Sequence, residues 1–123
     1  MKVSTTLIRA SSLDAAVALA INCQINDEPI SFVRRTSVRH KCPRLASGEW
    51  FMPTLNWRHF GAVIDDLRTP MVVFGYDFKK HFHIASAYAD IDTPATVRRA
   101  RELRVAAMLS IVASKFGETV ELP

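Results

Sequence analysis

The sequence predicts a small α+β domain, a layered sandwich in which a short, mainly antiparallel sheet is packed by an N-terminal and a long C-terminal helix. Two observations predict this class. Apolar residues recur at helical spacing near both ends of the chain. Between them lie two runs rich in β-branched and aromatic residues, separated by a short polar turn. The 123 residues, 49% of them hydrophobic, suit one domain spanning residues 1–123.

The first helix is expected to begin near Ser11, whose hydroxyl can cap free amides while Asp14 completes a capping box. Its apolar face then consists of Leu13, Val17, Ala20 and Ile21. Residues 26–29, with the sequence NDEP, predict a turn after this helix. A short strand is expected over residues 30–34.

The clearest β signal is a hairpin of residues 71–76 and 81–88, with DFKK as its loop. Alternation places His81, His83, Ala85 and Ala87 on one face of the second strand, and we expect that face to point outward. Residues 50–57 predict a short strand and a turn, whereas residues 61–67 fit either a strand or a helical turn.

The last helix is expected to start with Thr93 as its cap and Pro94 in its first position. Its apolar stripe of Val105, Leu109, Val112 and Phe116 predicts burial against a sheet. Gly117 is a suitable helix terminator because glycine tolerates the left-handed conformation.

Positive charge is concentrated in two segments of a chain whose net charge is +4. The first basic group lies in an acid-free segment that we expect to be a long loop, and comprises Arg34, Arg35, Arg39, Lys41 and Arg44. The second basic group lies on the expected C-terminal helix and comprises Arg98, Arg99, Arg101 and Arg104. Such groups favour anionic partners, although solvated surface residues explain them equally. One concave face shared by both groups would favour binding, and separate faces would not.

Other chemistry is weakly indicated. His40 with Cys42, and His81 with His83, are two ligand pairs that together offer zinc-compatible side chains, but their spacing matches no zinc finger or ribbon. Trp50 and Trp57 either stack nucleic-acid bases or belong to the core. Without a glycine-rich phosphate loop or a serine nucleophile elbow, we assign no catalytic residue and expect no cofactor.

The tail RVAAMLSIVASKFGETVEL resembles the C-terminal segment of the NinX-like phage proteins. LDAAVALA at residues 13–20 and FMPTLNW followed by GAVID are similar to further pieces of that family. The structural positions that match are Pro53, Trp57, Gly61, Ala107, Met108, Val112, Ser114, Lys115 and Gly117. The resemblance implies an α/β/α sandwich and a phage or prophage accessory protein of undetermined role, and it transfers no catalytic residue.

We therefore expect a non-enzymatic binding module that uses a basic surface for nucleic acid or a nucleotide. The alternative is a protein–protein module that docks an acidic host factor or self-associates as a homo-oligomer. A small hydrolase or nuclease that uses His81 or His83 is the third class. The two cysteines form no disulfide framework, and no apolar run approaches the roughly 18 residues of a membrane span. These features predict a protein of the bacterial host cytoplasm without a membrane partner.

Overall fold

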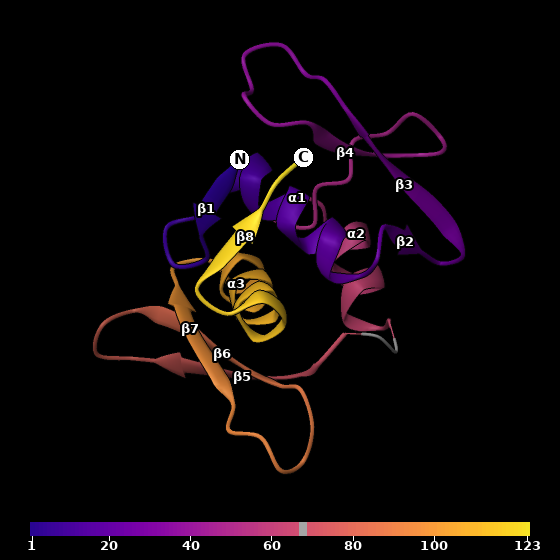
Figure 1. The fold of residues 1–123 in the computed structure, drawn as a ribbon. Coiled ribbons are helices and arrows are strands. Elements are labelled where there is room, and N and C mark those ends of the chain that lie inside the picture. Colours follow the sequence, from indigo (N-terminus) through magenta and orange to yellow (C-terminus); the bar gives the residue numbers. More distant parts are fainter. Residues whose placement is uncertain (67–68) are drawn as a thin grey trace.

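The structure, a computed structural model, describes residues 1–66 and 69–123 (Figure 1). Its helices are α1 (Ala10–Ala20), α2 (Trp57–Ile64) and α3 (Leu103–Phe116). Its strands are β1 (Lys2–Ser4), β2 (Gln24–Ile25), β3 (Glu28–Val33), β4 (Cys42–Leu45), β5 (Met71–Asp77), β6 (Phe82–Tyr88), β7 (Thr96–Ala100) and β8 (Thr119–Glu121). The described strands form three antiparallel sheets, ordered β1-β8, β2-β3-β4 and β5-β6-β7. No described helix is long and apolar enough to cross a membrane.

The two longer helices lie between two of the sheets. α1 contacts β4 on one side and α3 on the other, and α3 lies across β6 and β7 (Figure 1). This arrangement confirms the α+β class. We predicted a single sheet, whereas the structure has three among its described residues. The N- and C-terminal strands, β1 and β8, form a two-stranded sheet of their own.

Burial on both sides explains the composition of α1 and α3. Leu13, Val17 and Ile21 are fully buried, as the helical spacing predicts, but so are Ala15 and Ala16 between them. In α3 every residue from Ala106 to Ala113 is buried. A helix buried all round is typical of an element packed on several faces. The alanines allow the two helices to approach closely, because interaxial distance depends on the side chains at the contact.

The predicted cap of the first helix is wrong. The helix begins at Ala10, its cap residue Arg9 makes no side-chain capping bond, and Asp14 is buried. The Asp14 carboxylate instead accepts hydrogen bonds from the amide and the hydroxyl of Thr54. The two hydrogen bonds from Thr54 offset part of the cost of burying this carboxyl.

The predicted start of the last helix is also wrong. Residues 96–100 form strand β7 on the open edge of β6, and α3 begins only at Leu103. Thr93 lies in the preceding turn, where its amide and hydroxyl donate to the carboxylate of Asp90. The end of the helix is as predicted, since Gly117 follows it with a positive φ of 77°.

The hairpin of β5 and β6 is confirmed, with residues 78–81 as its turn. The predicted orientation of its faces is wrong, because Ala85 and Ala87 are buried on the side that α3 covers. His83 shares that inner face by alternation, whereas His81 is exposed in the turn.

The middle of the chain is more regular than predicted. Asn26 and Asp27, both with positive φ, form the tight turn between β2 and β3. The basic loop is shorter than expected, because Cys42–Leu45 pair with β3 as strand β4. Residues 61–64 complete helix α2, and Leu67, the last residue of that ambiguous segment, lies outside the described residues. Trp50 makes one isolated bridge, to Arg44, instead of a strand.

Candidate binding cleft

A cavity of about 350 Å³ opens between the first turn of α1, the basic loop and β4. We call it the Trp50 cleft. Its lining residues are Ala10, Ser11, Asp14, Arg35, Thr36, Val38, Cys42, Pro43, Trp50, Phe51, Met52 and Leu55. The walls are mainly apolar, with a few polar groups that converge on them, which is the composition of small-molecule sites in proteins.

Two members of the first basic group lie against Trp50, and one of them, Arg35, also lines the cleft. The guanidinium carbon of Arg35 lies 4.9 Å from the centre of the Trp50 ring, and that of Arg44 lies 5.3 Å from it. Arg44 also donates from Nε to the carbonyl of Gly48. Pairing of β3 with β4 produces the arrangement, because it brings the two ends of the basic loop against the segment that follows β4.

Asp14 contributes an unusual carboxyl to the cleft. Its side chain is 3% exposed, and its two oxygens accept from the Thr54 amide at 3.0 Å and the Thr54 hydroxyl at 3.1 Å. Burial raises the pKa of Asp14 to about 6, although the hydrogen bonds from Thr54 act in the opposite direction. Near neutral pH the cleft therefore contains a carboxyl that gains or loses its proton within the physiological range.

Cys42 and His40 lie where β4 meets α1. Burial raises the pKa of the Cys42 thiol, against a smaller effect of Arg35, so the thiol is a poor nucleophile at neutral pH. The His40 Nδ1 must donate to the carbonyl of Lys41, 2.8 Å away, because a carbonyl only accepts. In the neutral ring, Nε2 then accepts from the Ser12 hydroxyl at 3.1 Å. This pair of bonds ties the basic loop to the first turn of α1.

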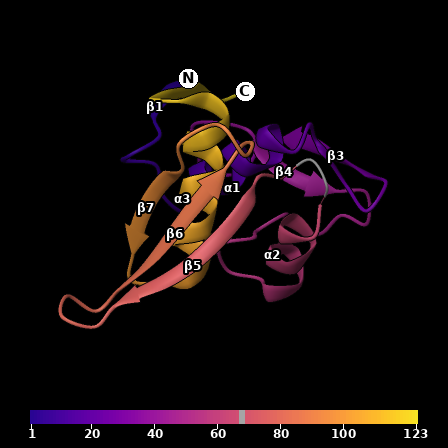
Figure 2. The ribbon, with the colours of Figure 1, turned by 90° about the horizontal axis from the view of Figure 1, so that it is seen from below.

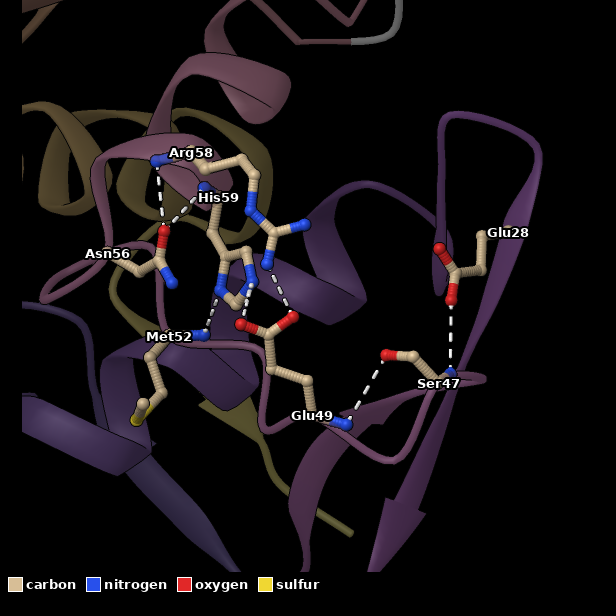
Figure 3. Close-up of polar contacts among 7 residues, drawn as sticks. All are labelled: Glu28, Ser47, Glu49, Met52, Asn56, Arg58 and His59. Carbon is tan, nitrogen blue, oxygen red and sulfur yellow. Dashed lines mark hydrogen bonds and ion pairs between the residues drawn. The ribbon is translucent and has the colours of Figure 1, made fainter.

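A polar cluster anchors residues 49–52, the segment that supplies Trp50, Phe51 and Met52 to the cleft lining (Figure 3). The Glu49 carboxylate binds the guanidinium of Arg58 and lies 3.5 Å from Nε2 of His59, and the bond to Arg58 lowers the pKa of Glu49. The His59 Nδ1 accepts from the amide of Met52 at 2.9 Å. Burial lowers the pKa of His59, although Glu49 opposes this effect. Asn56 caps α2 by accepting from the amides of Arg58 and His59, so residues 49–52 are anchored to a helix.

The remaining cations of the first basic group, Arg34, Arg39 and Lys41, are exposed. None of them forms an ion pair with an acid among the described residues. They flank the cleft along the chain, because they belong to the same short connection between β3 and β4 as Arg35.

The second basic group is divided among three elements. Arg98 and Arg99 are neighbours on β7 and point to opposite faces of the sheet, and Arg101 is exposed in the turn before α3. Arg104 alone turns toward the cleft region, where it donates to the carbonyl of Leu55 and lies 4.3 Å from the centre of the Trp57 ring. The two basic groups therefore do not form one concave face, and the Trp50 cleft lies beside the first of them.

The four candidate zinc ligands do not meet. His40 and Cys42 lie at β4, whereas His81 and His83 lie on the β5–β6 hairpin at the other end of the molecule (Figure 1). Within residues 1–66 and 69–123, no three histidine, cysteine or acidic side chains gather in a metal-binding arrangement. Both ring nitrogens of His40 have partners, and the ring of His83 packs against Tyr76.

Sequence reasoning missed Asp14 and Thr54 as a pair, and it did not connect Arg35 with Trp50. Two signals were available. Asp14 is the one acid among the apolar residues of the first helix, and only Glu49 separates Trp50 from the acid-free segment. Phe51 and Phe60 are core residues, as expected of large aromatics, whereas Trp57 is exposed and packs edge-on against Phe60.

The positions of the NinX-like resemblance are mainly structural. Pro53, Ala107, Met108 and Val112 are buried, and Gly117 ends α3. Ser114 and Lys115 lie in the last turn of α3, and Gly61 lies inside α2. No protein-family model matches the chain, and no curated protein matches it either.

Proposed function

We propose that this chain is a non-enzymatic binding module that takes an anionic ligand, a nucleotide or a single-stranded nucleic acid, in the Trp50 cleft. The observation that carries the proposal is the pair of guanidinium groups, from Arg35 and Arg44, over the Trp50 ring at an apolar cavity. In line with the NinX-like resemblance, we assign the module to phage or prophage accessory proteins that act in the bacterial host cytoplasm.

The charge distribution supports an anionic ligand. Arg34, Arg35, Arg39 and Lys41 follow one another within eight residues, and the connection that contains them has no acid. Arginine suits phosphate because its planar guanidinium donates two parallel hydrogen bonds. A phosphate at this rim would contact side chains that face water and have no carboxylate partner.

The lining of the cleft favours a ligand with a flat aromatic ring, such as a base. Bases stack on aromatic side chains and on guanidinium planes, and each stacked base contributes about 1–3 kcal/mol in single-strand binding sites. Trp50 and Arg35 provide both kinds of surface, and Met52 and Leu55 extend the apolar wall. The Asp14 carboxyl offers a polar edge for the exocyclic groups of a base.

A salt titration tests this proposal. Fluorescence anisotropy with a mixed-sequence single strand should give an affinity that falls steeply with salt, by roughly 0.7 log units per tenfold salt for each phosphate contact. Arg35→Ala should weaken binding and reduce that slope by about one contact. Trp50→Ala should weaken binding with little change in slope, because stacking releases no counterions.

Arg101→Ala is the matched control, since Arg101 is exposed and lies outside the cleft. It should leave both the affinity and the slope unchanged. Undetectable binding of DNA, RNA and nucleotides at low salt would exclude the proposal, as would equal losses in Arg35→Ala and Arg101→Ala.

A protein–protein module remains the second candidate, because β5 exposes apolar side chains on both faces, among them Met71, Val73 and Phe74. A pull-down from nuclease-treated host lysate distinguishes the two functions, since a partner that survives nuclease favours this candidate. The third class, a hydrolase or nuclease, requires turnover that is lost on substitution of His81 or His83.

A further inference from the structure

Within residues 1–66 and 69–123, strand β5 pairs with β6 alone and forms an edge of the β5-β6-β7 sheet. Its seven residues, MVVFGYD, carry no charge before Asp77. Met71, Val73, Phe74 and Tyr76 are all exposed, with Met71 at 65% and Val73 at 49%. A long apolar edge with free backbone groups is a template for pairing with another strand.

The opposite edge of the same sheet differs. β7 carries Arg98 and Arg99 in the middle of a five-residue strand, and charges of this kind are how proteins prevent edge pairing. α3 lies across the inner face of β6 and β7 (Figure 2). Phe74 and Tyr76 of β5 remain partly exposed. Several apolar side chains along the β5 edge are therefore exposed, whereas the edge strand β7 is protected by its arginines.

The sequence of β5 is complementary to itself in the antiparallel direction. With a two-fold axis at Phe74, the two Phe74 rings become cross-strand neighbours. Val73 then lies opposite Gly75 of the second copy, where the missing side chain leaves room, and Val72 lies opposite Tyr76. Aromatic and aromatic–aliphatic pairs of this kind stabilise antiparallel strands.

The same register places the tip of the β5–β6 hairpin of one copy beside the open end of that hairpin in the other copy. Phe78, 80% exposed at the hairpin tip, comes opposite Pro70 of the second copy. Pro70 lines a cavity of about 520 Å³ together with Met71, Tyr88 and Ile91. Next to Phe78, the exposed Lys79 and Lys80 approach the acidic turn that follows β6 in the other copy. That turn contains Asp90 and Asp92. Hydrogen bonds from Thr93 and from the amide of Asp92 lower the pKa of Asp90.

We infer that the chain forms a symmetric homodimer through β5, in which two three-stranded sheets join into one continuous six-stranded antiparallel sheet. The partner is a second copy because the apolar edge, the aromatic tip and its cavity, and the basic tip and the acidic turn all fit the same two-fold operation. This surface lies on a different sheet from the Trp50 cleft, so dimer formation and ligand binding are separate properties.

Sedimentation velocity on the full chain tests the inference with a matched pair of variants. Val73 on β5 and Val97 on β7 are exposed valines on the same outer face, at opposite edges of the sheet. Wild type should sediment as a dimer, Val73→Lys as a monomer and Val97→Lys as a dimer. Phe78→Ser, at a residue exposed in the monomer, should raise the dissociation constant by about tenfold or more.

Circular dichroism should show the same fold for all three variants, because each substituted side chain is at least 40% exposed. A monomeric wild type at every accessible concentration would overturn the inference. A dimer that survives Val73→Lys, or one that Val97→Lys disrupts equally, would overturn it too.

Discussion

Asp14 is a single residue whose protonation connects the cleft to the stability of the fold. Its folded pKa of about 6 lies above the ordinary value of 3.8, so the folded protein binds the proton more tightly than the unfolded chain. The resulting stabilisation is fully present below about pH 4 and is lost as pH rises through 6. The difference between the folded and the ordinary pKa corresponds to about 3 kcal/mol of stability.

Asp14→Asn is therefore expected to remove this pH dependence, because asparagine keeps the shape and can still pair with Thr54. Urea unfolding at pH 4 and pH 7.5 measures it. Between these pH values, wild type should lose roughly 2.5 kcal/mol of stability relative to the variant. A stability difference between the two proteins that stays constant over this range would contradict the assigned pKa.

At the scale of single elements, the C-terminal end of α3 depends on Gly117. Its φ of 77° is unfavourable for any residue with a Cβ, even though nothing lies within 4 Å of the Cβ position. Gly117→Ala should cost roughly 1–3 kcal/mol of the free energy of unfolding through backbone strain alone. Thermal or denaturant unfolding measures this cost.

Gly61→Ala is the matched control for that substitution. Gly61 lies inside α2 and also has no atom within 4 Å of its Cβ position. Alanine should stabilise the protein there by roughly 0.5–1 kcal/mol, because it is the better helix former. Equal effects of the two substitutions would mean that φ at Gly117 does not limit the residue type.

Local patterns predicted the elements whose partners are near in sequence. The β5–β6 hairpin and the end of α3 follow from alternation and from Gly117, and both are confirmed. Strand β7 was not predictable in this way, because its arginine-rich segment also suits a helix and the open edge of β6 decides the outcome. The pairing of Asp14 with Thr54 was not predictable for a similar reason, because the two residues are 40 positions apart in the sequence.

At the scale of the whole molecule, stability rests on the close contact of α1 and α3 between the sheets. Ala107 is fully buried in α3, within the core that both helices share. Ala107→Leu should destabilise the protein by about 1–3 kcal/mol, because a close-packed interior must shift to accept the added carbons. Ala46→Leu, at an exposed position, should stay within about 0.5 kcal/mol of wild type in the same unfolding measurement.

The Trp50 cleft is also a property of the whole molecule, because only the complete fold brings together the segments that line it. The first basic group could be recognised from the sequence, but not the ring that it faces. Arg35 and Trp50 are separated by 15 positions, and their contact depends on the pairing of β3 with β4. The sequence therefore indicated the charge of the surface and left its shape undetermined.

The most direct test is an NMR titration that follows the indole N–H signals of the two tryptophans separately. The chain has two tryptophans, Trp50 in the cleft and Trp57 outside its lining beneath Arg104. In a ¹⁵N-labelled sample, Trp57→Phe assigns the two indole N–H signals, and a nucleotide or short single strand is then titrated. We expect the Trp50 signal to shift progressively while the Trp57 signal stays in place. A stationary Trp50 signal, or a shift confined to Trp57, would contradict the assignment of the cleft as the binding site.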